Sequence, residues 1–214
     1  MALVKYNNNS LSAITAASGL TSGAMTLIKE QTASSSSTIS FVHGTSDVVL
    51  DSTYPIYVFK LISIHPSAGD GYLSFNGTTD GSNWNVTKTS SSFYAHHSEA
   101  DSTPSLGYAG GYDIAQGTGF QRILFDNNGA DTDMGHCAEI YFFNPSSTTF
   151  VKHFMSRCAG INTNSDGTTN PYSIDANVAG YFNTTSALTG IQFKMDNTGN
   201  IDTGTIKLYG IKDS

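Results

Sequence analysis

The densest group of metal-ligating residue types lies in the segment HHSEAD, where His96, His97, Glu99 and Asp101 fall within six positions. Imidazole and carboxylate groups bind Zn²⁺ and other divalent ions, and in an extended strand His97, Glu99 and Asp101 would share one face. A single local cluster without a distant ligand is more often the solvated polar edge of a loop. We therefore expect these side chains to face solvent, and we expect neither a metal nor another cofactor.

A second segment, DNNGADTDMG at residues 126–135, holds three aspartates and two asparagines, a composition similar to that of calcium-binding loops. An EF-hand requires a regular series of oxygen ligands followed by a distal glutamate, and the spacing here does not match it. Asp, Asn and Gly are also the ordinary residues of turns. This segment is interpreted as a turn.

Residues that could act as nucleophiles are poorly placed for catalysis. No serine lies in the G-x-S-x-G pattern of a nucleophile elbow. Cys137 follows His136 directly, and adjacent residues of a strand point to opposite faces, so this histidine is not positioned to activate the thiol. Cys158 lies near His153, and Glu139 is the only acidic residue that stands out in an apolar run. We expect no catalytic residue and no enzymatic activity.

The two cysteines, Cys137 and Cys158, are expected to be free buried thiols, because no secretory signal is visible at the N-terminus. A disulfide is the alternative. The two thiols could approach each other if the runs HCAEIYFF and TFVKHFMSRC pair around the turn NPSS.

Three tyrosines are the candidate ligand-binding residues. Tyr94, Tyr108 and Tyr112 flank or occupy residues 95–119, a long segment without clear periodicity that we interpret as an exposed loop. Long loops without secondary structure often carry function. A tyrosine ring can stack on a sugar and donate a hydrogen bond to it, and it can equally pack a loop onto the domain. Both roles stay open at this point.

Composition excludes several classes of protein. The net charge is −7, and the ten Lys and Arg residues are dispersed, which argues against a nucleic-acid surface. No apolar run approaches the ~18 residues of a membrane span, so we expect no membrane insertion. Charged residues make up 13% of the chain, against roughly 25% in ordinary soluble domains. This balance is typical of a strand-and-turn protein with a polar, mostly uncharged surface.

Strand patterns dominate after residue 23. Residues 54–66 are apolar on both faces, which predicts a central strand. Asn76-Gly77 and Asp80-Gly81 predict a hairpin between residues 72–75 and 84–88. The runs at 137–143 and 148–157 predict a second hairpin around NPSS, and 191–195 and 206–209 predict a terminal hairpin or near-hairpin.

About ten short strands at roughly 8–12-residue spacing predict an all-β fold, an antiparallel β-sandwich of the jelly-roll kind. Residues 1–22 show no stripe that could face a core, and we interpret them as an N-terminal arm or attachment segment. Residues 23–214 then form the β-sandwich domain.

Several segments resemble small virion structural proteins of marine tailed bacteriophages. They are SDVVLDSTYPIYVFKLISIHPS, LSFNGTTDGSNWNVTKTSS, YFFNPSSTTFVKHFMSR, AGYFNTTSALTGIQFKM and GNIDTGTIKLYGIK, which together cover most of residues 38–212. The resemblance implies a component of a phage particle, assembled in the host cytoplasm and bound to other capsid or tail proteins. It names no catalytic residue.

We therefore expect a non-enzymatic structural protein displayed on the virion, as a capsid decoration or a tail-associated protein. Repeated use in a particle favours a closed homo-oligomer, with a homotrimer as the first choice. The alternative is a carbohydrate-binding module at the tail that recognises a host surface glycan, with the long loop as its binding element.

Overall fold

The computed structural model describes residues 25–69, 71–102, 104–124, 129–162 and 171–212. All regular structure in these residues is β-strand, as the alternating sequence pattern predicts. The expected arm, residues 1–22, lies outside the described residues. The strands are β1 (Met25–Thr32), β2 (Ile39–Val42), β3 (Ile56–Pro66), β4 (Tyr72–Thr78), β5 (Lys88–Ser98), β6 (Ser105–Tyr108), β7 (Gln121–Arg122), β8 (His136–Phe143), β9 (Lys152–Asn162), β10 (Tyr172–Phe182), β11 (Gly190–Asp196) and β12 (Ile201–Ile211).

Two antiparallel sheets form a sandwich. The large sheet has the strand order β1-β12-β3-β8-β9-β10-β5-β6, and the small sheet has the order β2-β11-β4-β7. Pairing of β1 with β12, β2 with β11, β3 with β8 and β4 with β7 means that the chain folds back on itself as one long wrapped hairpin. This nested pairing is jelly-roll topology, so the predicted fold class is confirmed.

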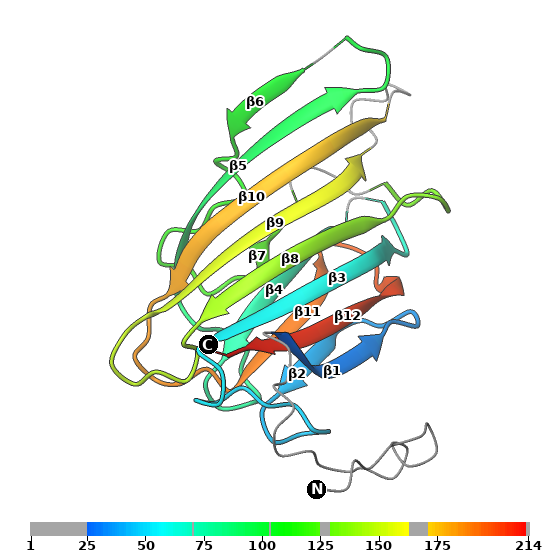
Figure 1. Cartoon of the computed structure of the whole chain (residues 1–214). Helices are drawn as coiled ribbons and strands as arrows, with labels where there is room; N and C mark the ends of the chain where they lie inside the picture. Colours follow the sequence, from blue (N-terminus) through cyan, green and yellow to red (C-terminus); the bar gives the residue numbers. More distant parts are fainter. Residues whose placement is uncertain (1–24, 70, 103, 125–128, 163–170, 213–214) are drawn as a thin grey trace, which may run out of the picture.

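Four strands extend the jelly roll on one side. The hairpin β9–β10 and the pair β5–β6 continue the large sheet beyond β8. In Figure 1 the small sheet lies behind the lower part of the large sheet, while β5 and β6 lie at the opposite edge from β1. The large sheet is therefore wider than the small sheet that covers it.

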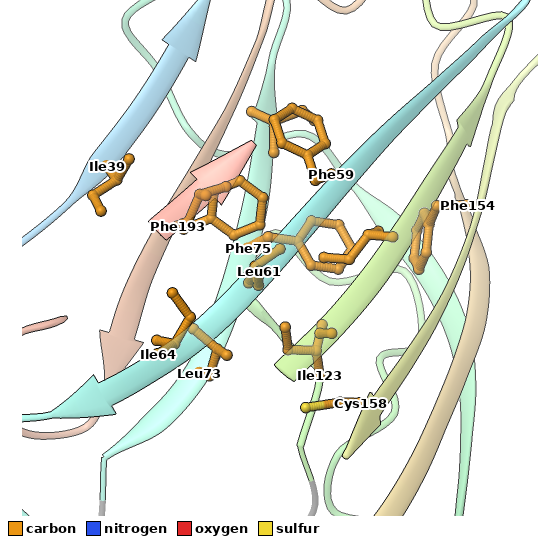
Figure 2. Close-up of a cluster of buried hydrophobic side chains, with 14 of the residues drawn as sticks. Ile39, Phe59, Leu61, Ile64, Leu73, Phe75, Ile123, Phe154, Cys158 and Phe193 are labelled. Atoms are coloured by element: carbon orange, nitrogen blue, oxygen red, sulfur yellow. The ribbon is translucent and has the colours of Figure 1, made fainter. Parts of the chain in front are cut away.

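Aromatic rings fill the space between the sheets. Phe59 on β3 meets Phe193 on β11, with ring centroids 5.2 Å apart, and Phe75 on β4 meets Phe154 on β9 at 5.1 Å. These four rings are at most 1% exposed. Figure 2 shows them between the strands, together with Leu61 and other aliphatic side chains of the core. Edge-to-face packing of this kind adds about 1 kcal/mol per pair beyond the burial of apolar area.

Residues 109–117 run alongside β5 and hydrogen-bond to its backbone, continuing the edge that β6 begins. The backbone amide of Ala109 donates to the Ser92 carbonyl, and Lys88 exchanges two backbone hydrogen bonds with Gly117. The predicted loop 95–119 was therefore only partly right. Its first residues belong to β5, and β6 lies within it. The rest runs along β5 and leads into β7 instead of projecting from one end.

Two predicted hairpins were wrong and one was right. The segments β8 and β9 pair around residues 144–151 as expected. The two closing runs do not pair with each other, because β11 lies in the small sheet and β12 in the large sheet. Asn76 and Gly77 lie inside β4, where the Asn76 side chain donates to the carbonyls of Trp84 and Thr118. The central position predicted for residues 54–66 is confirmed by β3, which lies between β12 and β8.

Candidate functional site

The candidate site is the outer face of the large sheet, the face turned away from the small sheet. Figure 1 is viewed onto this face. Strand alternation directs one set of side chains into the core and the other set onto the outer face. Cross-strand register then aligns residues that are far apart in sequence: Lys60 lies opposite Glu139, and Glu139 lies opposite Arg157.

A charged band crosses the middle of the outer face. Lys60 Nζ lies 2.9 Å from Glu139 Oε1, and Arg157 makes two bonds of 2.9 and 2.7 Å to the Asp175 carboxylate. The hydrogen bond from Lys60 lowers the pKa of Glu139, and the bonds from Arg157 lower the pKa of Asp175. The charged band comprises three cations and three anions, which are Lys60, Arg157, Lys207, Glu30, Glu139 and Asp175.

A hollow of about 610 Å³ lies over Ala159, within the charged band. The small side chain of Ala159 leaves space between the Lys60–Glu139 pair and the Arg157–Asp175 pair. Ile62 and Cys137 complete its wall, and the Ile62 side chain is 42% exposed. An exposed isoleucine beside two ion pairs gives this hollow a mixed apolar and charged lining.

A second hollow, of about 480 Å³, lies over Ala179 near the other end of the strands. Phe143, His153, Met155 and Tyr181 form its walls, and the His153 and Tyr181 rings lie 6.1 Å apart. The Met155 side chain is 55% exposed. Its lining is therefore mainly aromatic and apolar.

An apolar patch occupies the edge of the outer face at β5 and β6. Phe93 pairs with Tyr108 across the two strands, and Ala95 pairs with Leu106. Leu106 is 77% exposed, and Tyr108 is 61% exposed. The Tyr108 hydroxyl donates to Asp113 at 2.7 Å, and this bond raises the pKa of the phenol. Large apolar side chains grouped on a free sheet edge are typical of a surface that contacts another molecule.

The three tyrosines predicted as one candidate group lie in three different places. Tyr94 packs on the inner side of β5 and stacks on His96, with centroids 5.5 Å apart. Tyr112 packs against Tyr72 of β4, in the small sheet, with ring centroids 5.8 Å apart. Tyr108 alone lies in the outer-face patch. The structure does not bring the three together into one binding site.

The residues of the HHSEAD segment also diverge. His96 turns inward and stacks on Tyr172 at 5.0 Å, whereas His97 lies on the outer side, 3.1 Å from the Asp101 carboxylate. Within the described ranges, no group of three or more His, Cys, Asp or Glu residues could hold a metal ion. In the 126–135 segment the described part includes Asp131, whose carbonyl lies 3.1 Å from a ring nitrogen of His65.

The two thiols point to opposite faces of the large sheet. The runs that carry them do pair, with Cys137 opposite Ala159 and Ala138 opposite Cys158. Cys137 is exposed on the outer face, while Cys158 is buried in the core, where burial raises its pKa. Both cysteines are free. The expectation that both thiols are buried was wrong for Cys137, because the paired register puts it on the outer face.

The histidines near the cysteines do not approach them as catalytic partners. His136 is fully buried on the inner side of β8, opposite in direction to Cys137. His153 is exposed on the outer side of β9, opposite in direction to Cys158.

The part of the chain that the structure describes contains no helix long and apolar enough to cross a membrane.

Comparison with known proteins adds no relative: no family model, no curated protein and no solved structure matches this chain.

Proposed function

We propose that this chain is a non-enzymatic structural protein of a bacteriophage particle, displayed on the particle surface and used as a homo-oligomer. The observation that carries the proposal is the outer face of the large sheet. It combines a charge-balanced band, two hollows and an exposed apolar patch on one broad surface.

An antiparallel sheet with one solvated face normally presents polar side chains on that face. Here Ile62, Met155 and Phe93 are outward-facing and between 42% and 55% exposed. Exposed apolar side chains at several points of one broad face favour contact with another protein. The charges on this face are paired with one another, as in Lys60–Glu139 and Arg157–Asp175, so they add no net charge that would oppose such a contact.

Two further considerations support a structural role in a phage particle. The sequence resembles small virion structural proteins over most of residues 38–212, which gives the particle as the place of assembly. The residue types that could catalyse a reaction diverge in space, because His136 and Cys137 point to opposite sides of β8. Capsid or tail proteins would then be the partners, and assembly into the virion would follow synthesis in the host cytoplasm.

The test is the protein composition of purified phage particles, measured by quantitative mass spectrometry against the major capsid protein. Hundreds of copies per particle are expected for a capsid decoration protein, and a few copies for a tail-associated one. Antibody labelling in electron micrographs locates the protein on the particle. Absence of the chain from purified particles would refute the proposal.

A second candidate function is recognition of a host surface glycan at the phage tail. The hollow over Ala179 favours it, because sugar rings stack on aromatic side chains such as Phe143 and Tyr181. Saturation-transfer NMR with a panel of methyl glycosides tests this candidate directly. Signal transfer that disappears in the Tyr181→Ala variant would support it.

A further inference from the structure

We propose that the outer face of the large sheet binds the outer face of a second copy of this chain, so that two large sheets pack against each other around a two-fold axis. The inference rests on the structural role proposed above and names the partner of the candidate site. Three observations carry it: the balance of charge, the shape of the face and its area.

Balance of charge makes this face suited to self-association. The whole chain carries a net charge of −7, so two copies repel each other through most pairs of surfaces. The charged band is neutral, because each of its three cations is paired with one of its three anions. Both signs are present in one band, so cations of one copy can lie against anions of the other. A strongly basic or acidic partner would gain nothing from this pattern.

The outer face also carries both projections and hollows. Leu106 and Met155 project from it with 77% and 55% of their surfaces exposed. On the same face, the hollows over Ala159 and Ala179 have volumes of about 610 and 480 Å³. An isologous contact places the same patch on both copies, so each side of the contact brings both projections and hollows to it.

The available area matches that of a stable interface. Eight strands spaced ~4.8 Å apart, on average about nine residues long at ~3.3 Å per residue, give a face of about 1,000 Å². A standard stable interface buries ~800 Å² on each partner. The free edge of β6 alone, with four residues, offers far less area. The proposed contact is therefore face to face and not edge to edge.

The lining of the hollow over Ala179 suits an apolar side chain of a second copy. Thr89 Oγ1 already accepts two hydrogen bonds from Gln116, and Ser90 Oγ already donates to Gln121. Glycan sites require several polar groups directed at the ligand. Phe143, Met155 and the Tyr181 ring make most of the wall apolar, and His153 and Ser91 are its other polar groups, so the hollow suits an apolar side chain.

Size-exclusion chromatography with light scattering of the full chain is the first test. A mass twice the 22.7 kDa of one chain is expected at high micromolar concentration, with dissociation on dilution. The homotrimer expected from the sequence analysis is a different assembly, because three copies cannot be built from isolated two-fold pairs. A monomer at high concentration, or a trimer, would overturn the inference.

Substitutions locate the contact. Met155→Asp and Leu106→Asp each put a charge into an apolar part of the outer face, and each should weaken dimerisation by at least about tenfold. Phe150→Asp is the matched control, because Phe150 is 71% exposed but lies in the β8–β9 connection. Its dimerisation should be unchanged. Equal weakening in all three variants would contradict a contact through this face. Circular dichroism and thermal melting verify that each variant is folded.

The exposed thiol of Cys137 gives an independent readout, since it lines the hollow over Ala159. Labelling by a bulky maleimide should slow as protein concentration rises, and it should be fast at all concentrations in the Met155→Asp variant. A labelling rate that is independent of concentration in a protein that dimerises would place the contact elsewhere and overturn the inference.

Failure of this inference is distinguishable from failure of the proposed function. A chain that is monomeric in solution but abundant in purified particles refutes the two-fold contact and leaves the structural role intact. A dimer that is absent from particles refutes the structural role and leaves the contact intact. A monomer that binds methyl glycosides through Tyr181 overturns the contact and supports glycan recognition.

Discussion

Protonation of His136 should destabilise the fold as the pH falls. This side chain is fully buried on β8, and neither ring nitrogen has a hydrogen-bond partner among the described residues. The pKa of His136 is lowered from the ordinary value of 6.5 to about 4. The main cause is loss of hydration on burial, and the second cause is electrostatic repulsion from the nearby His65. The folded protein therefore holds a neutral imidazole at pH values where the unfolded chain has already bound a proton.

The sign and the size follow from proton linkage. Between about pH 6.5 and pH 4 the unfolded state binds more protons than the folded state, so stability falls as pH falls through this window. A pKa difference of 2.5 units corresponds to about 3 kcal/mol, all of it available above pH 6.5 and lost below pH 4. For a domain of ordinary stability this is a large fraction of the total.

The His136→Leu variant isolates this effect. Leucine has a similar volume, carries no proton and leaves no unpaired buried nitrogen, so the variant should be at least as stable as the wild type at pH 7. Urea unfolding followed by the fluorescence of Trp84 gives the unfolding free energy of both proteins at several pH values. Carboxylates that titrate in the same range contribute equally to both proteins, so the difference between them reports on His136. That difference should grow by about 3 kcal/mol between pH 7 and pH 4; a difference independent of pH would refute the reasoning.

Three other measurements test the fold. Gly204→Ala should lower the unfolding free energy by about 2–3 kcal/mol, because its φ is +119° and a Cβ would lie 2.6 Å from a backbone oxygen of β3; Gly111→Ala, which meets nothing within 4 Å, is the control. Lys88→Met should stabilise the protein by about 2 kcal/mol at pH 7, because burial penalises the charged lysine and lowers its pKa to about 8. Between about pH 8 and pH 10.5 the unfolded wild type binds more protons than the folded wild type, so the stability of the wild type alone should rise with pH in this range. A thiol reagent should modify Cys137 alone in the native protein and Cys158 only after unfolding, and a native disulfide on a non-reducing gel would contradict the register of β8 and β9.

Period-two alternation identified the strands but not their partners. Ile191 and Phe193 alternate with polar residues, as do Ile206 and Leu208, and each pair faces the core as expected. Alternation reports only which side of a strand is buried. Which strand lies beside it in the sheet depends on pairing across the whole chain. Residues 197–200 are long enough to span the ~10 Å between packed sheets, so the two runs that they join can lie in different sheets. A turn was therefore predicted correctly and a hairpin was not.

Asn76-Gly77 shows a different limit. An Asn-Gly dipeptide between apolar runs usually marks a tight turn. In this protein the Asn76 amide is fully buried and binds two carbonyl groups of other segments, at 2.6 and 2.9 Å. The preference of the dipeptide is local, and the hydrogen bonds that override it come from residues distant in sequence or outside the strand.

The candidate site was harder to predict than the fold, because it depends on cross-strand register. The Lys60–Glu139 pair joins β3 and β8, and no spacing in the sequence announces it. One signal was present: residues 54–66 are apolar on both faces, which predicts a central strand but does not say which face stays exposed. In the single chain the outward Ile62 is 42% exposed, because the small sheet covers only the inner face. Val58, also outward, is fully buried.

Nested pairing of the strands has a consequence for how the protein is made. Met25 pairs with Ile211, so the first described strand of the large sheet needs the last one as its neighbour. Ribosomes add ~5–20 residues per second, so β1 waits ~10–40 s before its partner emerges. Pairings between distant segments form slowly, since the loop they close loses much of its conformational entropy. Until then β1 and β3 both lack β12, and their exposed edges depend on dilution or on chaperones to avoid pairing with other chains.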